Sequence, residues 1–345
     1  MYKIENISAA TVESYKNCFD INNSPKSILS IKWQFLENTI NKQFVNIYID
    51  QANNKVAAIY AIAPVEFKIQ NNYLLASQSL DTITDVDYRG KGFFIKLATD
   101  LYEKAKDENI KLVYGFPNGN SIHGFSKKLS WKVLDPVPFL IKPIRASYFT
   151  KKIKILSWLP NFKLAFQNRI SKNIFFIEKF EFPNEVNTIW KKFSNNIPVA
   201  VERNKAYLDW RYISKPNENY KILHGYTADN TYIGFIVYCV KKKHGGNIAY
   251  IMEYIYDPKY ELEARYILKK AINNIIIEKA DCILTWCFKH SPNFRNYKKN
   301  LFINIPEILK PIELHFGVRS FDESLNNDVY ERTNWYLSYS DSDTV

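Results

Sequence analysis

The sequence has few cysteines, no long apolar run and no apolar leader, and each absence removes a class of protein. Four cysteines in 345 residues, with no CxxC pair, cannot form a disulfide framework or a four-thiolate zinc site. The N-terminus lacks the apolar core of a secretory signal, and no run approaches the roughly 18 apolar residues of a membrane span. The five histidines show no HxH or HExxH spacing. We therefore expect a reduced, cytoplasmic protein without a metal site.

The composition is that of a globular protein, with 46% hydrophobic and 24% charged residues, and the formal charge of +12 is concentrated in one segment. Residues 1–135 hold 16 Lys and Arg against 14 Asp and Glu, and residues 178–345 hold 23 against 21. Between them lie eight basic residues and no acidic one: Lys142, Arg145, Lys151, Lys152, Lys154, Lys163, Arg169 and Lys172. A nucleic-acid-binding protein needs a basic face rather than a basic linker, so this distribution argues against nucleic acid as a partner.

The same segment interleaves its cations with apolar side chains, which are Phe149, Trp158, Leu159, Phe162, Phe166 and Phe175. One interpretation is a packed linker whose aromatic side chains insert between two domains. The other is a basic amphipathic surface that sits on an anionic membrane leaflet. Either way, we place the domain boundary here and expect domains at 1–143 and 175–345, joined by a basic aromatic linker at 144–174.

Hydrophobic periodicity predicts the same order of elements in both blocks. Each block begins with a strand and two helices and continues with three strands, a long amphipathic helix, a buried strand and a short helix. The long helix precedes the buried strand at matching distances, 18 positions from Phe93 to Lys111 and 19 from Leu262 to Asp281. Trp33 and Trp210 occupy matching places in the second helices. We therefore expect an α/β (α+β) fold of two tandem domains, each a mostly antiparallel mixed sheet flanked by helices.

The most informative motif is YRGKGFF at 88–94, between a predicted strand and the long helix of the first block. Two glycines let the backbone bend there, and the N–H groups of residues 90–94 point out of the helix N-terminus. Arg89 and Lys91 add positive charge beside them. This arrangement favours binding of a phosphate group.

The run DVDYRGKGFF at 85–94, Asn118 at 25 residues after Phe93, and FSKKLSW at 125–131 together resemble the acyl-CoA-binding core of the GNAT acetyltransferase superfamily. The specific resemblance covers about residues 75–134. The whole chain, with YLDWRY at 207–212 and its ending at 335–343, is similar to tandem-domain GNAT proteins encoded with bacterial surface-polysaccharide enzymes. The resemblance implies acetyl-CoA or another acyl-CoA as co-substrate. It implies cofactor binding by Thr84, Val86, Arg89, Gly90, Lys91, Gly92, Phe93, Phe94 and Asn118.

The sequence departs from the family pattern at Phe125, where many members have the tyrosine that protonates the leaving thiolate. Ser121, Tyr114 or water is then expected to take that role, or the thiolate leaves with little help. In the second block the equivalent turn is DPKYEL at 257–262, with a proline, two carboxylates and no glycine. This block is not expected to bind CoA, and we assign it to recognition of the acceptor.

Acyl transfer also needs a general base and a site for the acceptor. Asp81 and Asp85 are the candidate bases, because the alternation of side chains along a strand places both on the same face as Ile83. Asp81 also lies eight residues before Arg89, where many members of the superfamily that the sequence resembles carry an acid. Backbone N–H groups near Val86 are candidate oxyanion donors. The candidate substrate-binding residues are His123 after the next strand and, in the second block, Arg203, Trp210 and Arg211, which suit a sugar through stacking and hydrogen bonds.

These features predict a cytoplasmic acyl-CoA-dependent N-acyltransferase, acetyl transfer being the first expectation, that acts directly on an amino sugar of a bacterial surface-glycan precursor. The precursor would be nucleotide-linked or lipid-linked, and transfer to a hydroxyl is chemically close. Two alternatives stay open. One is a peptidoglycan-bridge type aminoacyltransferase, which takes aminoacyl-tRNA and does not need the R-G-x-G loop. The other is a non-catalytic basic binding or scaffold protein.

Overall fold

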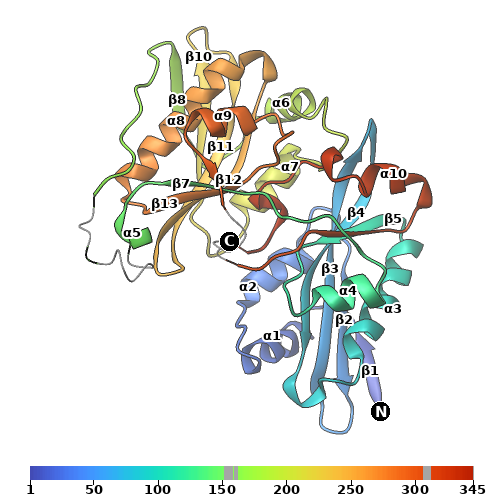
Figure 1. Ribbon diagram of the computed structural model, residues 1–345. Coiled ribbons are helices and arrows are strands. Elements are labelled where there is room, and N and C mark those ends of the chain that lie inside the picture. Colours follow the sequence, from blue (N-terminus) through green and yellow to red (C-terminus); the bar gives the residue numbers. More distant parts are fainter. Residues whose placement is uncertain (151–157, 159–161, 306–311, 345) are drawn as a thin grey trace.

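The computed structural model describes residues 1–150, 158, 162–305 and 312–344. Lys151, Lys152, Lys154 and Leu159 of the basic segment lie outside the described residues. The chain forms two mixed sheets, one in each half of the molecule, with helices against them (Figure 1). The fold predicted from the sequence is confirmed. No helix in the described ranges is long and apolar enough to cross a membrane.

The first sheet has eight strands, antiparallel except for the parallel pair β4–β5. Its order is β1 Tyr2–Glu5, β2 Phe44–Asp50, β3 Lys55–Ile69, β4 Asn72–Thr84, β5 Ile110–Gly115, β15 Gly317–Ser320 and β6 Lys132–Val133, and β9 Val199–Val201 pairs with β3. Side chains alternate along β3. Ala58, Tyr60 and Ile62 pack with α3 Phe93–Asp107, whereas Ile59 and Ala61 pack with α1 Val12–Ile21. The sheet is therefore covered on both faces.

The second sheet has seven strands and repeats this plan, with one parallel pair, β12–β13. Its order is β14 Ile303–Asn304, β7 Phe139–Pro143, β13 Cys282–Trp286, β12 Gly246–Tyr256, β11 Tyr232–Lys243, β10 Lys221–Thr227 and β8 Ile174–Glu178. Helix α8 Glu261–Ile277 packs along β10, β11 and β12, and α6 Val186–Phe193 packs against β11 and β12. The other helical elements are α2 Ile28–Ile31, η1 Lys32–Leu36, η2 Val86–Tyr88, α4 Ile122–Lys128, α5 Ser147–Thr150, α7 Lys205–Leu208, η4 Asp209–Ile213, η5 Pro258–Tyr260, α9 Phe294–Lys299, η7 Glu323–Leu325, α10 Asn326–Val329, η8 Arg332–Asn334 and η9 Tyr339–Asp341.

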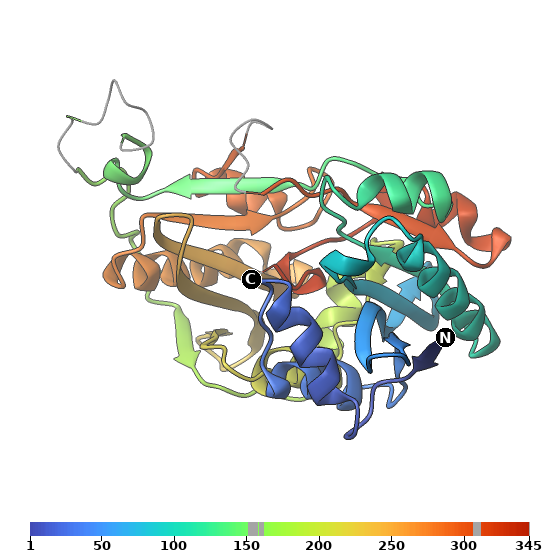
Figure 2. The same cartoon turned by 90° about the horizontal axis from the view of Figure 1, so that it is seen from below.

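The two halves exchange strands. β7 follows the first block in sequence, yet it lies in the second sheet between β13 and β14, where Leu284 pairs with Ile141 (Figure 2). In return, β15 from the end of the chain lies in the first sheet between β5 and β6, where Val318 pairs with Tyr114. Each half thus contributes a strand to the sheet of the other half. The division of the strands between the two sheets therefore does not follow the linear boundary expected between residues 143 and 144.

The matching tryptophans of the two halves meet. Trp33 in the π-helix η1 stacks on Trp210 in the π-helix η4, with ring centroids 4.5 Å apart. Each indole N–H donates to the backbone carbonyl of the other tryptophan, at 2.8 and 3.1 Å. This reciprocal contact relates the two halves by an approximate two-fold and fixes one wall of the space between them.

The basic segment does not pack its aromatic side chains between the two domains where the structure describes them. Trp158 is 77% exposed and Phe166 is 73% exposed, and Phe162 and Phe175 are also exposed. Phe175 lies on β8, the edge strand of the second sheet, on the side away from the first (Figure 1). The interpretation of a buried aromatic linker is therefore not supported at these four positions.

Candidate functional site

Strands β4 and β5 separate from each other partway along their length. Their last paired residues are Ser79 and Gly115, and β4 continues to Thr84 after β5 has ended. At that point β4 also has a bulge, because Leu80 and Asp81 together face the single residue Ala61 of β3. A bulge bends its strand and leaves an extra residue outside the ladder. The result is an open wedge beside the bulge.

This wedge, which we call the β4–β5 groove, has a volume of about 450 Å³. Its walls come from three places: the end of β4, the residues that follow β5, and the N-terminal end of α3. The lining residues are Ser79, Leu80, Thr82, Ile83, Thr84, Arg89, Phe94, Phe116, Pro117, Asn118, Asn120, Ser121, Gly124 and Phe125. Sequence-predicted Thr84, Arg89, Phe94, Asn118 and Ser121 are thus brought together, although they span 38 positions of the chain.

The turn between β4 and α3 is built to present backbone N–H groups. Asp85 accepts the N–H of Asp87 and caps the short helix η2, after which Gly90 and Gly92 adopt φ of 77° and 74°. A Cβ at either glycine would meet nothing within 4 Å, so the constraint is conformational rather than steric. Gly92 is the N-cap of the 15-residue helix α3, whose dipole is positive at this end. Arg89, whose Nε lies 3.4 Å from the carbonyl oxygen of Thr84, directs a cation into the same region.

The other predicted cofactor residues lie around this turn in different settings. Val86 is exposed, and Lys91 lies over the ring of Tyr88. Phe93 packs on the rings of Tyr2 and Tyr48 rather than into the groove. Among the backbone N–H groups near Val86 that are candidate oxyanion donors, the N–H of Val86 itself donates to Asn22 Oδ1 at 3.2 Å.

Opposite the turn, Asn118 shapes the far wall of the groove. Its side-chain oxygen accepts the N–H groups of Asn120 and Ser121, both at 3.1 Å. Phe125 packs edge-on against Phe94 with centroids 5.0 Å apart, so this aromatic side chain forms the floor. His123, in contrast, is exposed and does not line the groove.

The two candidate bases form hydrogen bonds and ion pairs on the side of the sheet that faces α1. Asp81 accepts a 2.5 Å hydrogen bond from the hydroxyl of Tyr15 and is ion-paired with Lys26. Asp85 is buried, which alone would raise its pKa. Lys55, the N–H of Asp87 and Asn22 outweigh this effect and hold the pKa of Asp85 below its usual value. Neither carboxylate lines the groove, and a lowered pKa makes Asp85 a poor proton acceptor.

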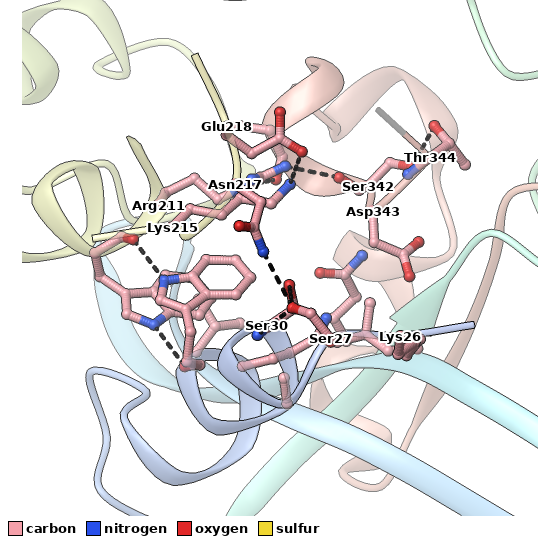
Figure 3. A pocket seen from close by; sticks show the side chains of 18 of the residues that line it. Lys26, Ser27, Ser30, Arg211, Lys215, Asn217, Glu218, Ser342, Asp343 and Thr344 are labelled. Carbon is pink, nitrogen blue, oxygen red and sulfur yellow. Dashed lines mark hydrogen bonds and ion pairs between the residues drawn. The ribbon is translucent and has the colours of Figure 1, made fainter. Parts of the chain in front are cut away.

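A second cavity, which we call the interdomain cavity, lies between the two halves and has a volume of about 460 Å³ (Figure 3). The first half contributes Lys26, Ser27, Trp33 and Gln78 among others, and the second half contributes Tyr207, Trp210, Arg211, Lys215 and the C-terminal residues Ser340, Ser342, Asp343 and Thr344. Leu80, at the bulge of β4, lines both this cavity and the β4–β5 groove. The two spaces therefore have Leu80, at the bulge, as a common wall residue.

The predicted acceptor residues of the second half separate in the structure. Trp210 and Arg211 line the interdomain cavity. Arg203 does not, because it is completely buried and ion-paired with Glu253 at 3.1 Å and Asp341 at 2.6 Å. The expected ligand contact by Arg203 is therefore replaced by a structural one: Arg203 holds the C-terminal segment 336–344, through Asp341, against the second sheet.

Tyr114 and Ser121, the candidates for protonating the thiolate, line different spaces. Ser121 lines the groove, whereas Tyr114 on β5 lines the interdomain cavity. Burial raises the pKa of Tyr114 well above its usual value, so its hydroxyl stays protonated and remains a donor.

Sequence reasoning missed Lys215 and Asp343. Lys215 follows η4, and its side chain is only 12% exposed. Burial and the nearby charge of Arg211 lower its pKa to about 7. Asp343 is exposed and lines the interdomain cavity next to Ser342. The available signal was SYSD at 338–341, a capping box that predicts an ordered turn near the end of the chain.

Comparisons with known proteins agree with this geometry. The family described as the acetyltransferase (GNAT) domain matches residues 6–133. None of the curated proteins matches the sequence. Among solved structures, N-myristoyltransferase of Saccharomyces cerevisiae with bound myristoyl-CoA is 10% identical with a TM-score of 0.62, covering 92% of this chain and 79% of that one.

Two further structures are similar over most of the chain. A probable N-acyltransferase from Enterococcus faecalis is 9% identical with a TM-score of 0.61, covering 93% of this chain and 72% of that one. A GCN5-related N-acetyltransferase from Anabaena variabilis is 12% identical with a TM-score of 0.59, covering 94% and 74%. Residues 6–133 thus match the acetyltransferase (GNAT) domain family, and the chain as a whole shares the two-sheet fold of N-myristoyltransferase.

Proposed function

We propose that the protein is an acyl-CoA-dependent N-acyltransferase that binds acyl-CoA in the β4–β5 groove and the acceptor amine in the interdomain cavity. The observation that carries this proposal is that Leu80, at the bulge of β4, lines both spaces. An acyl group that reaches the bulge from one side is exposed to a nucleophile from the other. Transfer then needs no acyl-enzyme intermediate.

The residues of the groove supply the contacts that acyl-CoA requires. The N–H groups at the start of α3, with Arg89, would hold the pyrophosphate. The free edge of β4 at Thr82 and Thr84 would pair with the amide groups of the pantetheine arm, because β5 has already ended. The backbone N–H groups of the bulge at Leu80 and Asp81 are the proposed oxyanion donors.

The proposed acceptor is an amino sugar of a surface-glycan precursor. The interdomain cavity combines aromatic rings from Trp33, Tyr114, Tyr207 and Trp210 with hydroxyl and amide groups from Ser27, Ser30, Gln78 and Asn217. Aromatic faces and side-chain amides are the groups that bind a sugar ring. The intact glycine turn favours this function over transfer from aminoacyl-tRNA.

The test is native mass spectrometry of the purified protein for bound CoA, followed by thioester consumption with a panel of amino sugars. We expect one CoA per chain and amine-dependent release of free thiol. A protein that binds no CoA, or that consumes thioester equally without an amine, would contradict the proposal.

We further propose peripheral contact of the second half with an anionic membrane, as a lipid-linked acceptor would require. The support is the exposure of Trp158, Phe162 and Phe166 next to the cations Lys163 and Arg169. Co-sedimentation with anionic vesicles should decrease from 0.1 to 1 M salt and be weak with neutral vesicles. The variant Trp158→Ser with Phe166→Ser should bind more weakly, whereas Phe44→Leu in the buried core of the first half should not. Binding that is indifferent to lipid charge would contradict this contact.

A further inference from the structure

A row of four polar side chains, which we call the Trp131–Ser79 network, leads from the interior of the first half to the β4–β5 groove. The indole Nε1 of Trp131 lies 3.0 Å from the hydroxyl of Tyr102. That hydroxyl lies 2.7 Å from the hydroxyl of Tyr60, which in turn lies 3.0 Å from Oγ of Ser79. Trp131, Tyr102 and Tyr60 are buried, whereas Ser79 lines the groove. The network therefore connects the core to the proposed cofactor site.

The donor at the buried end fixes the direction of all three hydrogen bonds. An indole N–H can only donate, so the hydroxyl of Tyr102 accepts from Trp131. Within the described residues, Tyr60 is the remaining hydrogen-bond partner of that hydroxyl, and Tyr102 therefore donates to Tyr60. The opposite direction would leave a buried hydroxyl proton without an acceptor. By the same argument Tyr60, which accepts from Tyr102, donates to Ser79.

This direction leaves the proton of Ser79 for a ligand in the groove. The hydroxyl of Ser79 accepts from Tyr60, and its own proton has no hydrogen-bond acceptor among the described residues. Ser121, the other serine that lines the groove, differs, because its hydroxyl donates to the carbonyl oxygen and the side-chain oxygen of Asn118, at 3.3 and 3.2 Å. Of these two serines, Ser79 is therefore the one that is prepared to donate to a bound molecule.

The surroundings of the network keep its hydroxyls protonated. Burial raises the pKa of Tyr60 and of Tyr102 above the usual value of a tyrosine, and the positive charge of Arg319, which acts in the opposite direction, is the smaller effect. Arg319 lies on β15, with its guanidinium carbon 4.9 Å from the ring centroid of Tyr102. A Cβ at Gly317 of the same strand would lie 2.8 Å from the ring of Trp131. The exchanged strand β15 thus packs on the buried end of the network.

Ser79 lies at the narrow end of the groove. It is the last residue of β4 that pairs with β5, and it directly precedes the bulge at Leu80 and Asp81, whose N–H groups are the proposed oxyanion donors. Thr82 and Thr84 follow the bulge, on the part of β4 that is proposed to pair with the pantetheine arm. An arm that enters from the phosphate turn therefore brings its terminal sulfur to the end of the groove where Ser79 lies.

The hydroxyl of Ser79 enters the groove from the face of the sheet that carries α3 and α4. Its partner Tyr60 packs with α3, and the ring centroid of Phe125 on α4 lies 6.4 Å from that of Tyr60. Phe125 also lines the groove, and it stands where the family that the sequence resembles has a tyrosine. A hydroxyl donor is thus present on the face from which that tyrosine is missing.

We propose that the hydroxyl of Ser79 donates a hydrogen bond to the sulfur of the bound acyl-CoA and stabilises the thiolate as it leaves. Ser79 is then a catalytic residue, and Tyr60, Tyr102 and Trp131 are positioning residues that act through it. This rests on the proposed function. In the transfer step the amine nitrogen bonds to the thioester carbonyl carbon, the C–S bond breaks with its electron pair moving to sulfur, and the amine releases one proton to water. Ser79 keeps its own proton throughout.

The test is the pKa of the CoA thiol in the complex, read from the ultraviolet absorbance of the thiolate as pH rises. Desulfo-CoA, which has no thiol, is the blank for ionisation of the protein's own tyrosines and cysteines. Ser79→Ala should raise the pKa of the bound thiol by about 1–2 pH units, because a hydrogen bond to a charged group is lost. Ser79→Thr keeps the hydroxyl and should restore the wild-type value. Ser77→Ala is the matched control, because Ser77 lies on the same face of β4 outside the groove and should leave the thiol pKa unchanged.

The positioning residues are tested by Tyr102→Phe, alone and combined with Ser79→Ala. Without the hydroxyl of Tyr102, Tyr60 can accept from Ser79, so the proton of Ser79 is divided between Tyr60 and the sulfur. The thiol pKa should then rise by less than in Ser79→Ala. In the double variant it should equal that of Ser79→Ala alone, since a residue that acts through Ser79 has no effect in its absence.

A thiol pKa that is the same in the wild type and in Ser79→Ala would overturn the proposal. So would a loss of CoA affinity in Ser79→Ala with an unchanged thiol pKa, because the hydroxyl would then bind an amide of the pantetheine arm. A thiol pKa in the double variant above that of Ser79→Ala would remove Tyr102 from the positioning residues and show that its effect is structural. Failure of the proposed function is distinguished in the same samples, because the wild type would then bind no CoA.

Discussion

After the bulged strand of the N-terminal half, the chain turns from Asp85 to Phe93 through two left-handed glycines, whereas in the C-terminal half it turns directly from Asp257 to Glu261. Both turns begin alike. Asp85 and Asp257 each accept the N–H two residues on, cap a short helix, and pair with a lysine, at 3.1 Å and 2.6 Å. The difference is the Arg89–Gly92 insertion in the first half alone, so the proposed cofactor site is an addition to a shared structural turn.

β12 also has a bulge, because Met252 lies between the residues paired with Val237 and Tyr238, and the spaces beside the two bulges differ. In the second half, Asn293 donates to the carbonyl of Tyr254 and the hydroxyl of Thr285 donates to the carbonyl of Ile251, both at 3.3 Å. These side chains close the wedge between β12 and β13. In the first half the corresponding wedge is the open β4–β5 groove. The second half therefore keeps the sheet but has side chains where the first half has an open groove. It contributes one wall of the interdomain cavity instead.

The first prediction tests the two-glycine turn, which only the first half has, and its expected effect is the largest. The double substitution Gly90→Pro and Gly92→Pro should abolish CoA binding, because proline cannot adopt φ near +75° and removes N–H donors. Tyr260→Ala, in the corresponding turn of the second half, should leave CoA affinity unchanged. Calorimetry with CoA measures both, and circular dichroism checks folding. Unchanged affinity in the double variant would remove the turn from the site.

The second prediction concerns the acids four positions before each capping aspartate. Asp81 bonds to Tyr15 and Lys26, and Glu253 bonds to Tyr336 and Arg203. Glu253→Gln should lower the free energy of unfolding by about 3 kcal/mol, because Arg203 has no access to water. Asp81→Asn should cost about 1–2 kcal/mol, since Lys26 is partly exposed. Denaturant titrations compare the two variants.

The same Asp81→Asn variant separates a structural acid from a base. If the acid is structural in both halves, kcat should stay within about tenfold of the wild type and the pH-rate profile should keep its shape. A loss of about 10²-fold with a displaced profile would instead establish Asp81 as the general base. Asp87→Asn, at an exposed position of the turn, serves as the control for both measurements.

The sequence predicted most of this fold because its elements are periodic. The long helices α3 and α8 begin within one residue of Phe93 and Leu262, where the pattern of hydrophobic residues places them, and Trp33 and Trp210 were matched in advance. The strands β7, β9, β14 and β15 were not expected, because they have two to five residues and owe their place to partners in the other half. The exchange of β7 and β15 is a long-range property that local periodicity cannot encode.

The candidate site, like the fold, could be predicted from the sequence only in part. The conformation of the glycine turn could be predicted, because a glycine pattern reports backbone conformation directly and Gly90 and Gly92 do have positive φ. The roles given to Asp81, Asp85 and Arg203 rested on residue type and place in the sequence. Neither reveals that Tyr15 and Lys26 bind the carboxylate of Asp81 or that Arg203 is buried. Asp343 was missed because its position depends on Arg211 and Lys243, both more than 90 residues away in sequence.

The third prediction uses Lys215, whose ion pair with Glu218 at 3.7 Å is longer than the 2.6 Å contact of Lys26 with Asp81. Its pKa is about 7 in the folded protein and about 10.4 unfolded, so between these values the unfolded chain binds more protons and stability rises with pH. This contribution amounts to at most about 1.4 kcal/mol per pH unit between pH 7 and 10, and the full cost is present below pH 7. The difference in unfolding free energy between wild type and Lys215→Met should change across this window. A constant difference would show that Lys215 has an ordinary pKa.

The last and smallest effect is expected at the contact that relates the two halves. Trp33 and Trp210 are stacked with ring centroids 4.5 Å apart, and each indole N–H donates to the backbone carbonyl of the other tryptophan. Trp33→Phe and Trp210→Phe therefore each remove one indole donor from equivalent positions. Each should cost about 1 kcal/mol, and the double variant should cost less than the sum, with a coupling of about 0.5–1.5 kcal/mol. Trp131→Phe removes a buried indole bond within the first half, to Tyr102, and should be additive with Trp33→Phe. Unequal costs, or additivity of Trp33 and Trp210, would mean that the two halves are joined mainly by the exchanged strands and that the approximate two-fold carries no energetic symmetry.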